Sequence, residues 1–167
     1  MQRMIIFSLA MVLSLQLAGG AVQTEAPRGV THLSEVQSLY LQHCGGCHGI
    51  QGISAPRDVP NLRDQVGNFL CTPAGRAYLV RLPNVARMPV SDQALADVMN
   101  FVVFDLGGLR DMRAVVAQYT ADEVAHLRKR PLTDTGLADY RARIVKDLVK
   151  RCGAPASLRD YSIDKRN

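Results

Sequence analysis

The stretch Cys44-Gly45-Gly46-Cys47-His48 constrains this chain more than any other feature. Two thiols three positions apart can each add to one of the two vinyl groups of a haem. The residue that follows then places an imidazole beside the iron. This C-x-x-C-H spacing is the attachment signature of c-type haem, so it predicts one covalently bound haem c held by Cys44 and Cys47, with His48 as an iron ligand.

Two other uses of the cysteine pair compete with haem attachment. The pair could form a local disulfide, or it could bind zinc, which would need a second Cys or His pair at ligand spacing. The remaining cysteines, Cys71 and Cys152, are single residues far apart in the chain and make no second pair. Haem attachment is therefore the favoured interpretation.

The N-terminus resembles a secretory signal peptide over residues 1–21. Arg3 precedes an apolar run from Met4 to Leu17, and small residues continue to Ala21. The run is shorter than the roughly 20 residues that a membrane-spanning helix needs, which makes an uncleaved anchor the weaker alternative. Because haem c is attached outside the cytoplasm in bacteria, we expect a periplasmic protein that is cleaved after Ala21.

Charge divides the rest of the chain into two parts. Residues 22–108, the expected haem domain, carry a formal net charge of −1, whereas residues 109–167, a C-terminal extension, carry +5. Such an extension suits an acidic redox partner or peripheral contact with an anionic membrane, although a solvated helix face would have the same composition. We expect redox proteins as partners, and no nucleic acid.

Hydrophobic periodicity predicts an all-α fold. A capping-box pattern at Ser34 and Gln37 begins a helix that runs into Cys44. Ser91 begins a second helix, whose apolar face consists of Leu95, Val98, Met99, Val102 and Leu106. The remaining expected elements are a loop over 49–68, a helix over 74–82 stopped by Pro83, a loop over 83–90, and extension helices that begin at Thr120 and span about 136–152.

The second axial position of the iron would decide the chemistry. A protein ligand there favours electron transfer, whereas an open position favours gas binding or peroxide chemistry. Met88 lies in a loop that can fold over a haem, so it is the preferred sixth ligand. Met99 falls on an apolar helix face and Met112 among charged residues. The histidines that could bind instead are weaker candidates: His32, His43 and His126.

These residues resemble the class I monohaem c-type cytochromes over about residues 33–106. The matching parts are Leu39-Tyr40, the motif with Gly49, Pro60-Asn61-Leu62, Met88-Pro89 and a closing helix with Phe101. The resemblance implies a small helical shell around one haem, with its first and last helices crossing. It also implies that the Pro60 carbonyl accepts a hydrogen bond from the His48 ring, and that Met88 binds the iron.

Two departures from that family stand out. Val36 occupies a position where the family often has a glycine for close helix crossing. The extension from about 109 to 167 has no counterpart in the minimal family core, which suggests an added role.

Three further expectations concern side chains outside the motif. In an oxidising compartment, Cys71 and Cys152 are expected to pair, with two buried free thiols or a bond to another subunit as the alternatives. Arg76 and Arg87 are candidates to pair with haem propionates, although each could be an ordinary surface arginine.

The function expected from the sequence is therefore one-electron transfer in the periplasm by a haem c with His/Met ligation. Electrons would pass from a dehydrogenase toward an oxidase or another cytochrome, and no substrate would be converted by this chain. The alternatives are a haem subunit of a larger dehydrogenase, and a haem enzyme or gas sensor with an open iron site.

Overall fold

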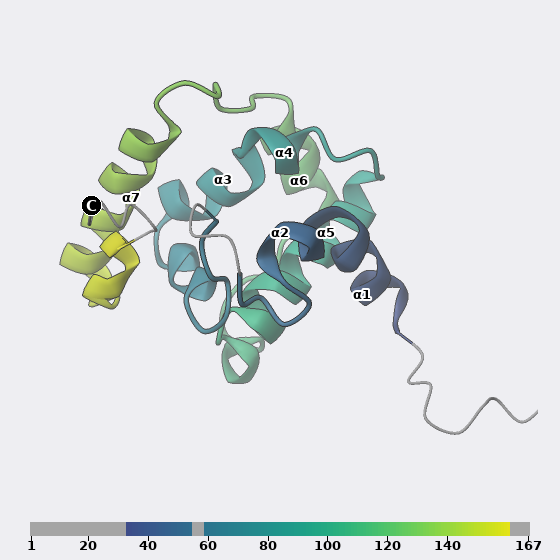
Figure 1. The fold of residues 1–167 in the computed structure, drawn as a ribbon, viewed down its shortest axis with the longest axis horizontal. Helices are drawn as coiled ribbons and strands as arrows, with labels where there is room; N and C mark the ends of the chain where they lie inside the picture. The colour runs from purple at the N-terminus through teal and green to yellow at the C-terminus, as the bar shows by residue number, and fades with distance from the viewer. Residues whose placement is uncertain (1–32, 55–58, 161–167) are drawn as a thin grey trace, which may run out of the picture. The chain divides into compact units, whose positions relative to one another are not determined.

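The computed structural model describes residues 33–54 and 59–160 (Figure 1). The expected signal peptide and His32 lie outside these residues. Within them every regular element is a helix and no strand occurs, which confirms the all-α prediction. No helix in this part of the chain is long and apolar enough to cross a membrane.

The first helical run carries the cysteine motif. Ser34 and Gln37 form the predicted capping box, because the Ser34 hydroxyl accepts from the Gln37 amide at 3.2 Å and the Gln37 side chain accepts from the Ser34 amide at 2.9 Å. The run continues without a break to His48. Its segments are α1 (Glu35–Tyr40), a wide π-helical turn η1 (Leu41–Gly45) and α2 (Gly46–His48).

The middle of the chain is more helical than predicted. Val66–Cys71 forms a 3-10 helix, η2, which begins within the segment expected to be a loop over 49–68 and continues beyond it. The helix predicted over 74–82 is α3 (Pro73–Arg81), capped by the Thr72 hydroxyl. Pro83 follows the end of that helix and also begins the next one, α4 (Pro83–Ala86). A proline suits the first position of a helix, because the amide hydrogen that it lacks has no partner there.

The closing helix crosses the first one through an aromatic pair. Ser91 caps α5 (Asp92–Asn100), which continues as η3 (Phe101–Leu106), and the five predicted core positions of this helix are all buried. The Tyr40 and Phe101 rings meet edge to face at 5.5 Å. Val36, a valine of the first helix, is half-buried and packs against the same core.

The C-terminal extension shares this core rather than forming its own. It contains η4 (Arg110–Met112), α6 (Ala121–Arg128), α7 (Leu137–Cys152) and η5 (Ala156–Asp160). In Figure 1, α6 lies beside α4, and α7 stands on the far side of α3. Eight buried side chains of the extension belong to the single apolar cluster: Tyr119, Val124, Leu132, Ile144, Val145, Leu148, Ala154 and Leu158.

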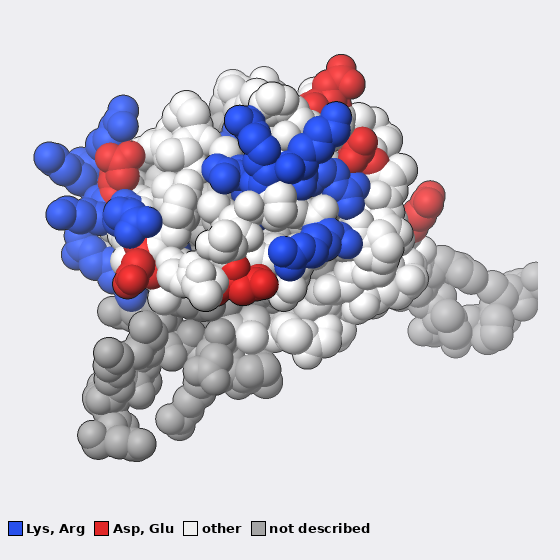
Figure 2. All heavy atoms as spheres, turned by 90° about the horizontal axis from the view of Figure 1, so that it is seen from above, with Lys and Arg blue, Asp and Glu red and all other residues white. Residues whose placement is uncertain are grey.

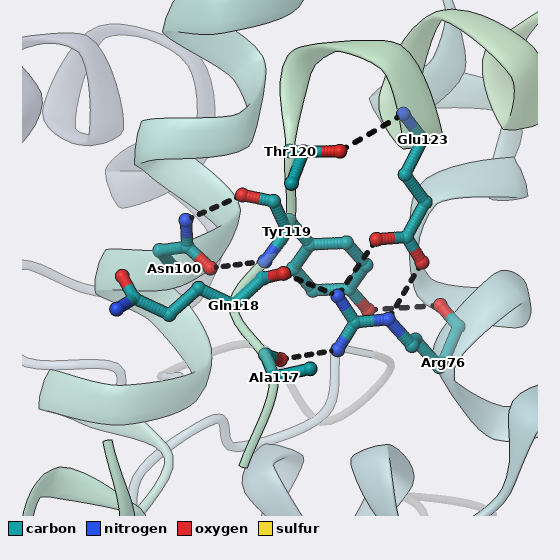
Figure 3. A network of polar contacts seen from close by, with 7 residues as sticks. All are labelled: Arg76, Asn100, Ala117, Gln118, Tyr119, Thr120 and Glu123. Atoms are coloured by element: carbon teal, nitrogen blue, oxygen red, sulfur yellow. Dashed lines mark hydrogen bonds and ion pairs between the residues drawn. The ribbon is translucent and has the colours of Figure 1, made fainter. Parts of the chain in front are cut away.

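Buried polar contacts fix the start of the extension (Figure 3). The Asn100 side chain accepts from the Tyr119 amide at 2.8 Å and donates to the Tyr119 carbonyl at 3.0 Å, while the Tyr119 hydroxyl donates to the Arg76 carbonyl at 2.8 Å. The Thr120 hydroxyl caps α6 as predicted. The Glu123 carboxylate accepts from the Arg76 guanidinium at 2.6 and 2.7 Å, so Glu123 joins α6 to α3.

A disulfide fixes the other end of the extension. Cys71, at the end of η2, is bonded to Cys152, the last residue of α7, with their Cα atoms 6.4 Å apart. The predicted pairing of these two cysteines is thereby confirmed. Gly153 then ends α7 in the left-handed conformation at φ +66°, where a residue without a side chain carries no steric cost.

This disulfide generates a stability prediction. Replacing Cys71 and Cys152 together by serine should lower the free energy of unfolding by about 2–4 kcal/mol, because the bond closes a long loop and so restricts the unfolded chain. Urea unfolding followed by circular dichroism measures the change. Each single variant should show the same loss as the double variant. Unfolding curves that all match the wild type would contradict the prediction.

Candidate functional site

A cavity in the described part of the chain collects most of the predicted site residues. Its space, including the open mouth, is about 1050 Å³. Cys44, Cys47 and His48 line it together with Met88 and Pro60. The rest of the lining is mainly apolar and comes from η2, α3, α4, α5, η3 and the segments next to them. It includes Leu62, Val66, Phe69, Tyr78, Leu79, Leu82, Val85, Leu95, Val98, Met99 and Val102.

The two cysteines of the motif carry free thiols at this cavity. Cys44 is half-buried and Cys47 is exposed. The two thiols are not bonded to each other, so the pair does not form the local disulfide that was one alternative. Burial, and then the neighbouring Cys47, raise the pKa of the Cys44 thiol to about 11. No group of three or more His, Cys, Asp or Glu side chains suited to hold a metal ion occurs among residues 33–54 and 59–160.

His48 is oriented by a backbone contact. Its Nδ1 lies 2.9 Å from the Pro60 carbonyl oxygen, the contact that the family resemblance implied. Because a carbonyl oxygen can only accept, Nδ1 carries the proton in this hydrogen bond, and the lone pair of the neutral ring is on Nε2. Burial lowers the pKa of His48, while the hydrogen bond to Pro60 acts in the opposite direction. The result is a neutral imidazole able to bind a metal through Nε2.

A short loop holds the residues around His48 in place. The Tyr40 hydroxyl donates to the Gly49 carbonyl at 2.7 Å, and burial raises the pKa of this phenol to about 12. The Ser54 hydroxyl donates to the Val59 carbonyl at 2.8 Å, and the Ser54 amide donates to the Asn61 side chain at 2.7 Å. These bonds fix the backbone on both sides of Pro60.

Two methionines line the cavity. Met88 lies in the loop between α4 and α5, as predicted, and is 5% exposed. Met99 is equally buried, which agrees with its expected place in the core, but its side chain also faces the cavity. Met112 is exposed and does not line it. The structure therefore offers two thioethers where the sequence favoured one.

The histidines other than His48 are distributed differently. His43 lines the cavity and is an exposed residue of η1. His126 is exposed on α6 and lies 2.6 Å from the Arg130 guanidinium. Of the weaker histidine candidates within the described residues, only His43 is brought to the cavity.

The arginine at the cavity is not one that the sequence suggested. The guanidinium of Arg76 binds Glu123 and the carbonyls of Ala117 and Gln118, and Arg87 is exposed beside Asp134. Neither lines the cavity, because both are directed toward the extension. Arg141 of α7 lines it instead.

Arg141 is 8% exposed and donates to the Leu158 carbonyl at 2.8 Å. A signal for it existed in the sequence. Arg141 falls between Leu137 and Ile144 on the apolar stripe of α7, where a cation is unexpected. Its appearance in that stripe marks it as a residue with a role in the interior.

Comparison of the chain with protein-family models, with curated proteins and with solved structures gave no match.

Two glycines of the motif region give a matched pair of variants. Gly49 has φ +72°, and a Cβ there would lie 2.2 Å from the Ile53 carbonyl oxygen, so Gly49→Ala should destabilise the protein by about 1–3 kcal/mol. Gly46 has φ −61° and open space around it, so Gly46→Ala should be neutral or stabilising by up to about 1 kcal/mol. Urea unfolding separates the two, and equal losses would contradict this account of the turn.

Proposed function

We propose that the cavity holds one haem c in a cytochrome c-like shell, with Cys44 and Cys47 as attachment residues and His48 and Met88 as iron ligands. The observation that carries the proposal is that all four residues line one mainly apolar cavity, although Met88 is 40 positions from His48. Iron bound between an imidazole and a thioether is suited to electron transfer, because neither axial position is left for a substrate.

The free thiols fit the attachment chemistry. Each thiol adds across one vinyl double bond: its sulfur bonds to one carbon, and its hydrogen ends on the other. No oxidant is consumed in this addition. Cys44 and Cys47 are separated by about one helical turn on the η1–α2 run, so both sulfurs lie at the same cavity edge.

His48 and Met88 would limit rearrangement at the iron. The hydrogen bond to Pro60 fixes the orientation and tautomer of the His48 ring, which makes Nε2 the better electron donor. Met88 is buried, so its thioether is shielded from water. Haem supplies an iron that cycles between the ferrous and ferric states. A sulfur ligand and an apolar surrounding both favour the ferrous state and so raise the potential.

Arg141 supports the fit of the cavity to this cofactor. Haem carries two carboxylates, and a planar guanidinium recognises carboxylates well. Because Arg141 is the arginine of the cavity lining, we assign to it the electrostatic role that Arg76 and Arg87 were expected to have.

The proposed role is that of a one-electron carrier exported to the periplasm, with redox proteins as partners. Cys47 is exposed where it lines the cavity, and the nearby Ile50 is 72% exposed, so this edge is accessible to another protein. Figure 2 shows Lys and Arg side chains in two groups, one at the end that carries α7. Exposed basic residues there include Arg143, Lys146, Lys150 and Arg151, which suit an acidic partner.

Attachment is tested by expressing the chain in a bacterial periplasm that makes c-type cytochromes. We expect the wild type to retain haem through denaturing electrophoresis and to have the mass of the processed chain plus one haem. The Cys44→Ser/Cys47→Ser variant should release any haem it binds. The Cys71→Ser/Cys152→Ser variant is the matched control and should retain haem. A purified wild type that contains zinc and no haem would refute the proposal.

Ligation is tested by optical absorption with and without carbon monoxide. The ferric wild type should show a methionine–iron charge-transfer band, and the ferrous wild type should not bind carbon monoxide. Met88→Ala should lose the band and bind carbon monoxide, because an axial position is opened. Met99→Leu, with a side chain of similar volume at the same cavity, should keep the band. Loss of the band in Met99→Leu alone would make Met99 the ligand. Carbon monoxide binding by the wild type would instead support an open-site haem enzyme or gas sensor.

A further inference from the structure

One side chain of the extension holds the loop that carries Met88. Arg128, the last residue of α6, is 17% exposed in its side chain. Its guanidinium donates to three carbonyls and one carboxylate between the end of α4 and the start of α5: Nε to Ala86 at 3.0 Å, Nη2 to Met88 at 2.5 Å, and Nη1 to Val90 at 2.9 Å and to Asp92 at 3.0 Å.

The acceptors follow a simple spacing. They belong to residues 86, 88, 90 and 92, so every second residue of the segment turns an oxygen toward Arg128. Backbone hydrogen bonds hold the start of this segment to α4, since the Ala86 and Arg87 amides donate to Leu82 and Pro83. Beyond them, the described backbone bonds of the segment are local. The Met88 amide donates to Val85 and the Val90 amide to Met88, and Pro89 has no amide hydrogen. A planar guanidinium with five N–H groups can bind several acceptors of such a segment at once, whereas an ammonium cannot match that geometry.

The helix that carries Arg128 is itself firmly held. Val124 of α6 is fully buried, and the Glu123 carboxylate is bound by Arg76 of α3. Tyr119, just before the helix, is locked to Asn100 in the core. Arg128 therefore reaches the loop from a fixed base, and the loop cannot move away without breaking its bonds to a part of the chain that is anchored elsewhere.

We propose that Arg128 is a positioning residue that keeps Met88 bound to the iron. This inference rests on the proposed His/Met haem site. It gives the C-terminal extension a specific role, because the extension then supplies the contact that determines whether the sixth ligand stays in place. Without Arg128 the loop would open more often, the thioether would leave the iron, and the axial position would become available to small ligands.

Two substitutions of Arg128 test the idea. Arg128→Gln removes the charge and most of the donors, and Arg128→Lys keeps the charge while losing the planar set of N–H groups. Both should show a weaker ferric charge-transfer band, carbon monoxide binding to the ferrous protein, and a lower reduction potential than the wild type. The band should be stronger in Arg128→Lys than in Arg128→Gln but weaker than in the wild type, because the lysine ammonium can still pair with the Asp92 carboxylate.

Arg76→Gln is the matched control. Arg76 has almost the same side-chain exposure, 16%, and also joins the extension to the rest of the chain through one carboxylate and two backbone carbonyls. Within the described residues, none of its hydrogen bonds or ion pairs reaches the Met88 loop. Arg76→Gln removes the Glu123 contact of α6, but buried Val124 and the bonds between Tyr119 and Asn100 still hold that helix. We therefore expect Arg76→Gln to lower stability in urea as Arg128→Gln does, yet to keep the band and to remain inert to carbon monoxide.

A second readout does not depend on the iron spectrum. The Val90 amide donates to the Met88 carbonyl at 2.9 Å, so hydrogen exchange at Val90 reports loop opening. Exchange there should be about tenfold faster in Arg128→Gln than in Arg76→Gln, which corresponds to roughly 1.4 kcal/mol.

The outcomes separate this inference from the proposed function. A wild type without haem, or one that binds carbon monoxide, refutes the His/Met site itself. A wild type with the methionine band and Arg128 variants that match it in band, carbon monoxide binding and Val90 exchange refutes the role of Arg128 alone. Equal weakening of the band in the Arg76 and Arg128 variants would also refute it, because the loss of the band would then result from lower overall stability and not from the lost contacts to the Met88 loop.

Discussion

The exchange of two hydrogen bonds between the Asn100 side chain and the Tyr119 backbone is the contact on which the rest of the structure depends. Both residues are buried, and a buried donor or acceptor without a partner costs about 1–3 kcal/mol. Asn100 ends the regular turn of α5, and Tyr119 leads into α6. The pairing therefore sets where the extension returns to the core. Once Tyr119 is placed, Thr120 caps α6 and Glu123 meets Arg76.

Beyond that contact, the extension binds two elements that line the cavity and adds a residue to its lining. Arg128 binds the loop with Met88, Arg141 joins the cavity lining, and the Cys71–Cys152 bond attaches α7 to η2. Among residues 33–54 and 59–159, no buried side-chain nitrogen or oxygen lacks a hydrogen-bond partner. The guanidinium groups of Arg76, Arg128 and Arg141 can be buried because backbone carbonyls accept most of their hydrogen bonds. The helices that surround the cavity cannot pack fully against one another, and the extension stabilises them by packing against their outer sides.

Features that depend on nearby residues were predictable. The capping box at Ser34, the buried face of α5 and the end of α7 at Gly153 all follow from spacings of a few residues. The contact of His48 with Pro60 was expected only through the family resemblance, and the structure contains it. The helix over 66–71 was missed because it lies among glycine, proline and aspartate residues that commonly mark loops.

By itself the sequence determined most of the helices, the cysteine–histidine motif and the two cysteines available for a disulfide, because backbone preferences and motif spacing act over one or two helical turns. Only the tertiary structure decided that Arg141 rather than Arg76 lines the cavity, that Met99 joins Met88 there, and that Arg128 binds the Met88 loop. An arginine side chain is long and can meet any carbonyl within its reach. Its partner therefore depends on how distant segments pack, which no local pattern records.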